Sequence, residues 1–444
     1  MNFQRYLSNY KQIIRLGLPI VVGQAGLIVV GFADNIMVGR YSTEALSAAS
    51  FVNNVFNMAV MACLGFTYGI TPLVGALFGG QNHDRIGSLM RNAQIINVIY
   101  TLAIIAVMGI IYLNLDRLGQ PEELLPLIRP YYLLFMCGML PMTVYNVWAQ
   151  CSYGMKSTRM PMWIILGVNV LNVGGNYLLI YGHCGMPELG LFGAGLATLA
   201  ARCASALIIV YIFMTGKRFA AVRTGYRASR RNANTVRLLF RTSLPVSMQL
   251  FMETAAFSGA AIFVGWIGAL ELAAFQVMVI VGTLGFCFYY SLGAATSVLV
   301  ANAAGSGDYA KMRRIGFSGY HLTLLMALSA SAVFAFAGRS LIGLFTNDSA
   351  VIAIAMTLIP PLLCYQLGDA TQINFANALR GTSKVMPMLW IAFVSYLVIG
   401  LPATYLFAFP LGGGIIGVFY SFSVSLFLAG ALFFDYFMKY TRKA

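Results

Sequence analysis

Long apolar stretches follow one another through almost the whole chain, and each is long enough to cross a lipid bilayer as a helix. A membrane-spanning helix needs about 20 mainly apolar residues. Such stretches are expected at 13–37, 47–73, 93–115, 127–152, 160–182, 190–215, 240–267, 274–301, 316–337, 350–377, 387–409 and 414–438. They lack the alternating pattern of barrel strands, and their small residues suit packed helices. The sequence predicts an all-α integral membrane protein with about twelve transmembrane helices.

Composition and the distribution of basic residues support this fold class. The chain has 444 residues, of which 59% are hydrophobic and only 9% are charged, so it exposes far too little polar surface for a soluble protein. Lys and Arg gather in the N-terminal segment, in every second loop and after the last helix, whereas the opposite loops hold few. The positive-inside rule then places both termini in the cytoplasm, which requires an even number of spans.

The net charge of +15 includes one strongly basic run at 217–237. A basic run can indicate nucleic acid binding, but here we expect a cytoplasmic linker that also meets anionic lipid headgroups, and no nucleic acid partner. The sequence contains no Walker motif, no Ser-His-Asp order and no metal-ligand spacing. We therefore expect no enzyme activity and no cofactor, and a transport process driven by an ion gradient.

The two halves of the chain form an internal repeat with an offset of 226 residues. Leu18-Pro19 aligns with Leu244-Pro245, and the Met-Pro-Met triplet at 160–162 aligns with the one at 386–388. Each half contains six predicted helices, so both enter the membrane in the same direction, and a pseudo-two-fold axis along the membrane normal should relate them. The expected organisation is a six-helix lobe at 1–216, a basic linker and hinge at 217–239, and a second six-helix lobe at 240–444.

Three carboxylates, Asp34, Glu253 and Asp369, lie inside strongly apolar segments, whereas the other ten fall in loops or at segment ends. A carboxylate is costly in lipid and is usually functional there. The three align with uncharged residues in the other half, so the lobes share a scaffold and differ in chemistry. These acids are the candidate functional residues.

Asp34 has polar candidates for neighbours in the predicted fifth and sixth helices. Asn169, Asn172 and Asn176 share one face of the fifth helix, and Thr198 lies in the sixth. This set could hold a cation with carboxylate and amide oxygens, or hold a proton on Asp34. Ordinary hydrogen bonding between helices is the alternative interpretation of the asparagines.

Glu253 and Asp369 form the second candidate site. Glu253 lies eight residues beyond Pro245, near the middle of the bilayer, where reversible protonation or exchange of a proton for Na⁺ is feasible. Asp369 follows Pro360-Pro361, where the helix should bend and leave carbonyl groups free. Tyr365, one turn before Asp369, could support a cation with its ring or simply pack. Buried acids satisfied by hydroxyl or amide groups are the alternative.

Several long motifs resemble those of one known family in the same order. They are LGLPIVVGQAGLIVVGFADNIMVGRYSTEALSAAS in the first half, NVLNVGGNYLLIYG followed by MPELGLFGAGLAT, LPVSMQLFMETAAF at the start of the second half, and CYQLGDATQINFANALRGT. Over its full length the chain resembles the multidrug and toxic compound extrusion (MATE) transporters of the NorM type. The resemblance implies twelve helices in two pseudo-symmetric lobes, and a monomer in the plasma (inner) membrane of a prokaryote.

The resemblance also implies a function and site roles. It implies efflux of organic, mainly cationic, drugs in exchange for Na⁺ or H⁺. Glu253, Asp369 and Tyr365 match the cation site of the second lobe, and Na⁺ at Glu253 and Asp369 is the favoured coupling ion. Residues Asp34, Asn172, Asn176 and Thr198 match the acid cluster of the first lobe. Asn176 stands where some relatives carry a second acid.

Two other classes of function remain open at this stage. A flippase for a lipid-linked oligosaccharide or peptidoglycan precursor has a related architecture, but its site should offer Arg and Lys to pyrophosphate, whereas this chain offers acids. A channel or membrane enzyme is disfavoured because the acids are single and asymmetric and no catalytic set is present.

Overall fold

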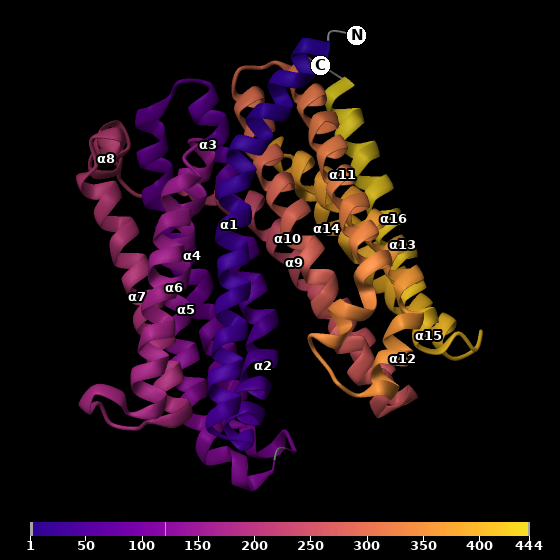
Figure 1. The fold of residues 1–444 in the computed structure, drawn as a ribbon. Helices are drawn as coiled ribbons and strands as arrows, with labels where there is room; N and C mark the ends of the chain where they lie inside the picture. The colour runs from indigo at the N-terminus through magenta and orange to yellow at the C-terminus, as the bar shows by residue number, and fades with distance from the viewer. Residues whose placement is uncertain (1–2, 120, 443–444) are drawn as a thin grey trace. The chain divides into compact units, whose positions relative to one another are not determined.

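The computed structural model describes residues 3–119 and 121–442, and this part of the chain consists of helices and connecting loops, with no strand (Figure 1). The α-helices are α1 (Phe3–Tyr41), α2 (Thr43–Tyr68), α3 (Ile70–Gly79), α4 (His83–Leu113), α5 (Leu125–Gly154), α6 (Arg159–Tyr181), α7 (Gly190–Thr215), α8 (Ala220–Ala228), α9 (Ala233–Ile267), α10 (Ala269–Gly305), α11 (Tyr309–Gly343), α12 (Ser349–Thr357), α13 (Ile359–Gly381), α14 (Met386–Ala392), α15 (Leu401–Ala408) and α16 (Gly414–Arg442). Short 3₁₀ helices occupy η1 (Leu115–Arg117), η2 (Glu122–Leu124), η3 (His183–Gly185) and η4 (Lys217–Phe219), and η5 (Phe393–Gly400) is a π-helix.

The predicted number of transmembrane spans is confirmed. Among the described residues, eleven helical segments are long and apolar enough to cross a membrane, and the bent pair formed by α12 and α13 makes the twelfth. The two members of this pair meet at an angle of 52°. The bend falls at Leu358, two residues before the Pro360-Pro361 pair, as the sequence predicted, because proline cannot donate the backbone hydrogen bond that would continue the helix.

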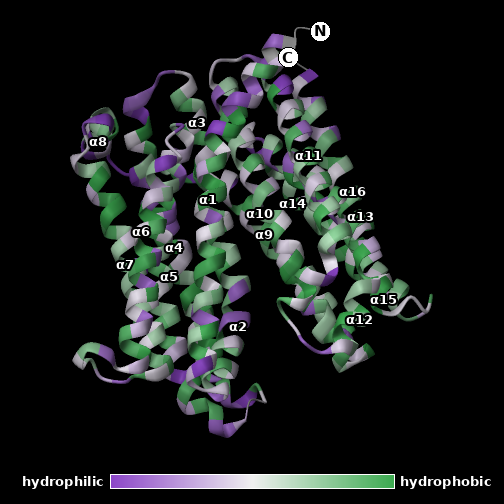
Figure 2. Cartoon of the chain, in the orientation of Figure 1, coloured by the Kyte–Doolittle hydropathy of each residue, from purple (hydrophilic) through white to green (hydrophobic). Residues whose placement is uncertain are grey.

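The helix surfaces are those of a protein surrounded by lipid. Figure 2 shows hydrophobic residues along the middle of the long helices and hydrophilic residues mostly near their ends and on α8. Large apolar side chains are strongly exposed, with Leu207 at 72%, Val170 at 73% and Phe336 at 93%. A water-soluble monomer does not expose so many large apolar side chains, whereas a bilayer solvates them.

Contacts between Cα atoms divide the chain into two compact units. Unit 1 comprises 1–21 and 248–444, and unit 2 comprises 22–247. In unit 1, α13 packs against α10, α11 and α16. In unit 2, α5 packs against α2, α4 and α7, and α6 packs against α7. Each unit thus surrounds a central helix with several others, and the candidate residues lie on these helices or on α1 and α9.

Residues 1–21 belong with unit 1 rather than with the rest of α1. Asn9 Nδ2 donates to Ser318 Oγ over 3.4 Å, and the Tyr10 hydroxyl lies 2.8 Å from Nδ1 of His321. The contact grouping thus differs from the expected lobe boundaries at this segment, and the division into lobes by the internal repeat stays a prediction. Both connections between the units run through continuous helices, α1 and α9, two residues after Pro19 and Pro245.

The expected linker is a structured part of unit 2, and its role as a hinge stays a prediction. Residues 217–232 contain η4 and α8, and α9 already begins at Ala233. Helix α8 packs on α4 at two glycines: a Cβ on Gly87 would collide with the backbone of Val222, and a Cβ on Gly225 would collide with the carbonyl oxygen of Asp84. Because glycine has no side chain, the backbones of α4 and α8 can touch at these two positions, and this contact holds α8 in place.

Candidate functional site

The first candidate cluster is assembled by three helices of unit 2. Asp34 comes from α1, Asn172 and Asn176 from α6, and Thr198 from α7. Asn176 Nδ2 donates to Asp34 Oδ1 and, over 3.3 Å, to Asn172 Oδ1, while Asn172 Nδ2 donates to Thr198 Oγ1 over 3.2 Å. The structure therefore brings all four predicted residues into one chain of hydrogen bonds.

The spacing in the sequence explains this geometry. Asn172 and Asn176 are four residues apart, so their side chains lie on one face of α6, and both are buried. Asn169, the third asparagine of this face, does not take part in these hydrogen bonds, and its buried Nδ2 has no hydrogen-bond partner among the described residues. Two of the three predicted asparagines thus contact the acid network and one does not.

Arg202 and Tyr131 are additional members of this region. Arg202 interacts electrostatically with Asp34 and with Tyr131, and its guanidinium lies 4.8 Å from the ring centre of Phe135. It follows Thr198 by four residues on α7, so the same-face rule could have placed it near the site. Arg202 and Asp34 form no ion pair in the described part of the chain, and the arginine charge balances the acid from a distance.

The second candidate cluster lies in unit 1. Glu253 is carried by α9, and Tyr365 and Asp369 lie one turn apart on α13. The carboxyl groups of Glu253 and Asp369 interact electrostatically with each other and with the Tyr365 hydroxyl. Asp369 is 2% exposed, so its charge is almost fully removed from solvent. The structure therefore brings the three predicted residues within range of electrostatic interaction.

Three further polar residues complete this cluster. Gln249 Nε2 donates to Glu253 Oε2 over 3.2 Å, and Tyr396 interacts electrostatically with both acids. Gln372 lies three residues after Asp369 on α13 and is also buried. The helical spacings from Glu253 to Gln249 and from Asp369 to Gln372 could have revealed the two glutamines. No spacing connects Tyr396, because it lies on another span.

Tyr396 is brought to the acids by an irregular helix. It lies in η5, the π-helical segment between α14 and α15. A π-helix holds extra residues per turn and changes the direction of the side chains that follow, and such segments are frequent at functional sites. The sequence predicts an ordinary span here and gives no signal for this residue.

Several oxygen atoms around the acid pair lack a partner. Gln249 Oε1, Asp369 Oδ2 and Gln372 Oε1 are buried and have no hydrogen-bond partner among the described residues. Buried polar atoms are normally satisfied, so a group of such oxygens beside two carboxyl groups needs a physical reason. A bound cation that accepts these oxygens as ligands supplies one, since hard cations prefer oxygen ligands.

Aromatic side chains line one side of the second cluster. Phe257 meets Tyr365 edge to face with ring centres 6.2 Å apart, and Phe422 lies 6.3 Å from Tyr365. A cavity of about 10 Å³ lies beside Phe257, Tyr396 and Phe422. Drug-sized pockets measure roughly 300–1,000 Å³, so this cavity holds about one water molecule and is not a drug pocket in this conformation.

The fold and the two polar clusters inside the spans define a multi-pass membrane transporter. The sequence model of the MatE family matches residues 19–178 and again residues 245–406. The two matches begin 226 residues apart, which is the offset of the internal repeat. The chain belongs to the MatE family, and each half is one copy of its characteristic unit.

Individual relatives cover nearly the whole chain. The probable multidrug resistance protein NorM of Photorhabdus laumondii is 27% identical over 431 residues, which are 96% of this chain and 94% of that protein. The multidrug resistance protein MdtK of Pectobacterium atrosepticum is 28% identical over 409 residues, 91% of this chain and 89% of the relative. The crystal structure of the eukaryotic MATE transporter AtDTX14 has a TM-score of 0.88 at 16% identity, and the match covers 99% of this chain and 98% of that one. The structural likeness confirms the predicted fold class.

Proposed function

We propose that the protein is a cation-coupled multidrug efflux antiporter that exports organic, mainly cationic, compounds in exchange for Na⁺ or H⁺ by alternating access. The names of the NorM and MdtK relatives support drug efflux. The observation that carries the coupling proposal is the pair formed by Glu253 and Asp369, two carboxyl groups inside membrane spans that interact with each other. Intramembrane acids are costly and usually serve an ion or substrate pathway.

Competition for the acid pair provides the coupling. A Na⁺ ion or a proton neutralises the carboxyl groups and lowers their attraction for a cationic drug. Release of that cation restores the negative charge and attracts the next drug molecule. The two ligands thus affect each other's binding reciprocally, as thermodynamic linkage requires. The transporter converts this competition into exchange when the ion-bound form and the drug-bound form favour different orientations of the site.

Na⁺ is the coupling ion that the second cluster favours. A proton needs one basic oxygen, whereas Na⁺ needs several oxygen ligands at once. Gln249 and Gln372 offer oxygens without a hydrogen-bond partner in the described chain next to the two acids, and the Tyr396 hydroxyl interacts electrostatically with both acids. The polar cluster of unit 2, with its single acid Asp34, would bind a proton, a cation or the drug itself.

The proposed membrane orientation follows from the basic residues. We propose a monomer in the plasma membrane of a prokaryote with both termini in the cytoplasm. The support is the concentration of Lys and Arg in the N-terminal segment, in alternate loops and after α16.

The proposed function is tested by drug uptake into inside-out proteoliposomes. Ethidium uptake is measured under an imposed Na⁺ gradient and, separately, under an imposed pH gradient. Wild type should accumulate ethidium under at least one gradient, and the effective gradient identifies the ion. Glu253→Gln and Asp369→Asn should reduce gradient-driven uptake at least tenfold, because each removes a charge for which drug and ion compete.

Two matched variants test whether the loss of any acidic residue lowers ethidium uptake. Glu122→Gln and Glu123→Gln change exposed acids far from the cluster in sequence and should leave uptake unchanged. Failure of the wild type to accumulate ethidium under either gradient would overturn the antiporter proposal. Normal uptake by both cluster variants would overturn the role of the acid pair.

A further inference from the structure

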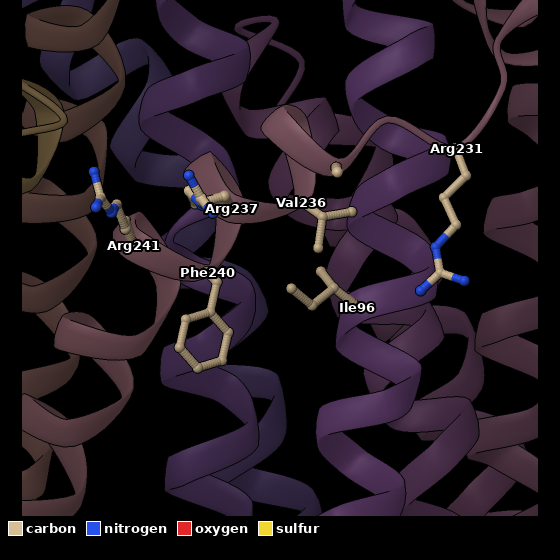
Figure 3. A pocket seen from close by; sticks show the side chains of 7 residues that line it. Ile96, Arg231, Val236, Arg237, Phe240 and Arg241 are labelled. Carbon is tan, nitrogen blue, oxygen red and sulfur yellow. The ribbon is translucent and has the colours of Figure 1, made fainter.

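An open pocket of about 890 Å³ lies where the linker enters α9, away from both acid clusters. Its walls are formed by Arg231 of the linker, by Val236, Arg237, Phe240 and Arg241 of α9, and by Ile96 of α4. Figure 3 shows Arg231 on one side and Arg237 and Arg241 on the other, with Val236 and Ile96 between them. All of these residues belong to unit 2.

The charge of this arginine pocket is entirely positive. Three of its lining residues are arginines and none is acidic. None of the three forms an ion pair in the described part of the chain, where the ion pairs are Arg129–Asp116 and Lys439–Asp435. Guanidinium groups pair well with phosphate because they present parallel N–H donors. The pocket therefore suits a phosphate-bearing anion and repels a cationic drug.

The backbone that carries Arg231 is held firmly against α4. Asn92, which is fully buried, accepts a hydrogen bond from the Asn232 backbone N–H over 3.0 Å. The hydroxyls of Ser88 and Ser229 lie 2.8 Å apart, and Arg91 donates to the Ser229 carbonyl. These bonds fix the chain on both sides of Arg231. The arginine thus extends from an ordered backbone, which lowers the entropic cost of binding.

The two arginines of α9 lie next to apolar side chains of the same helix. Arg237 and Arg241 are four residues apart and share one face. Phe240 in the pocket is 43% exposed, and the neighbouring Leu238 is 47% exposed. Helix α9 is one of the membrane spans, so its first turns pass from the polar surface into the hydrocarbon. Cationic and apolar groups are therefore combined at the level of the lipid headgroups.

We propose that this pocket binds the headgroup of an anionic glycerophospholipid. The arginines contact the anionic headgroup from both sides of the pocket, and an acyl chain packs along Phe240 and Val236. The combination of charge and apolar surface favours a lipid over a soluble phosphate, since a soluble anion would leave Phe240 exposed. Basic pockets between membrane helices are suited to such headgroups.

The proposal is tested with the full-length protein by native mass spectrometry after release from micelles that contain phosphatidylglycerol and phosphatidylcholine in equal amounts. Wild type should retain phosphatidylglycerol preferentially. The triple variant Arg231→Gln, Arg237→Gln and Arg241→Gln should lose this preference, and each single variant should lower retention about fivefold, as expected for one basic residue at a membrane surface. Phe240→Ala should reduce lipid retention while leaving the charge unchanged.

A second triple variant controls for net charge. Lys217→Gln, Arg218→Gln and Arg227→Gln remove the same charge from exposed positions of the same segment outside the pocket, and should retain the lipid. Equal loss in both triple variants, with each still monodisperse on size exclusion, would overturn the site. Equal binding of soluble glycerophosphoglycerol and of the lipid would overturn the choice of occupant, as would equal retention of both lipids by wild type.

Discussion

At the scale of single residues, the two halves hold their acids in different ways. Asp34 accepts a hydrogen bond from Asn176 within a network of neutral amides, whereas Glu253 and Asp369 interact electrostatically with each other. Amide donors favour the charged form of a single acid, whereas two neighbouring acids need a shared cation or proton. We therefore expect the second pair to depend more strongly on a bound ion than the single acid does.

Adding a second acid beside Asp34 should change the coupling. In Asn176→Asp two carboxyl groups would meet without an amide between them, and one proton would have to be shared. We expect ethidium uptake driven by a pH gradient to rise at least twofold relative to uptake driven by Na⁺. The control is Asn35→Asp on the exposed face of the same region of α1. An unchanged ratio in Asn176→Asp would contradict the expectation.

The Tyr396 hydroxyl should contribute directly to ion binding. Tyr396→Phe removes the hydroxyl that interacts with both acids without changing the ring, at a cost of about 1 kcal/mol. The Na⁺ concentration for half-maximal uptake should therefore rise about fivefold. Tyr405 on α15 is 48% exposed, and Tyr405→Phe should leave the Na⁺ concentration for half-maximal uptake unchanged. An equal effect in both variants would assign the loss to general packing.

At the scale of helices, the glycine contact between α4 and α8 explains why the linker is ordered. Gly87→Leu should force α8 away from α4, because the added side chain collides with the backbone of Val222. Trypsin should then cleave near Arg223 and Arg227 at least tenfold faster. Gly109→Leu is the control on the same helix, since a Cβ there meets nothing within 4 Å. Similar cleavage rates in the two variants would show that α8 does not depend on this contact.

The helices themselves were largely predictable, and the exceptions have physical causes. Apolar stretches define the spans because the bilayer demands that every backbone polar group bond within its own helix. The bend at Leu358 was predictable from two prolines. The π-helix around Tyr396 was not, since no local signal distinguishes it and only packing against neighbours selects it. The order in 217–232 was missed because a basic composition looks the same in a free linker and in one docked through Gly87 and Gly225.

The candidate site shows the same limit. Residues related by helical spacing, such as Asn172 with Asn176 and Tyr365 with Asp369, could be placed together from the sequence. Contacts between distant segments, such as those of Glu253 with Tyr396, depend on how the spans pack, which spacing within one helix cannot reveal.

At the scale of the whole molecule, the proposed topology has a direct test. Arg218→Cys and Leu118→Cys place single thiols in two loops on a background without native cysteines. A membrane-impermeant maleimide should label Arg218→Cys only in everted vesicles and Leu118→Cys only in right-side-out vesicles, because basic loops stay in the cytoplasm. Both positions are in exposed segments, with Leu118 46% exposed. Labelling of Arg218→Cys in right-side-out vesicles would contradict the proposed orientation and indicate the opposite one.

Helix α9 carries both Glu253 and two arginines of the lipid pocket, with Pro245 between them. A helix transmits torque along its axis, whereas a loop transmits only tension. Any rotation of α9 that accompanies ion binding at Glu253 must turn Arg237 and Arg241 through the same angle, unless the missing hydrogen bond at Pro245 absorbs it. Binding of a lipid headgroup and occupancy of the ion site are thus mechanically linked through one helix. The stiffness of this helix at Pro245 sets the strength of that link.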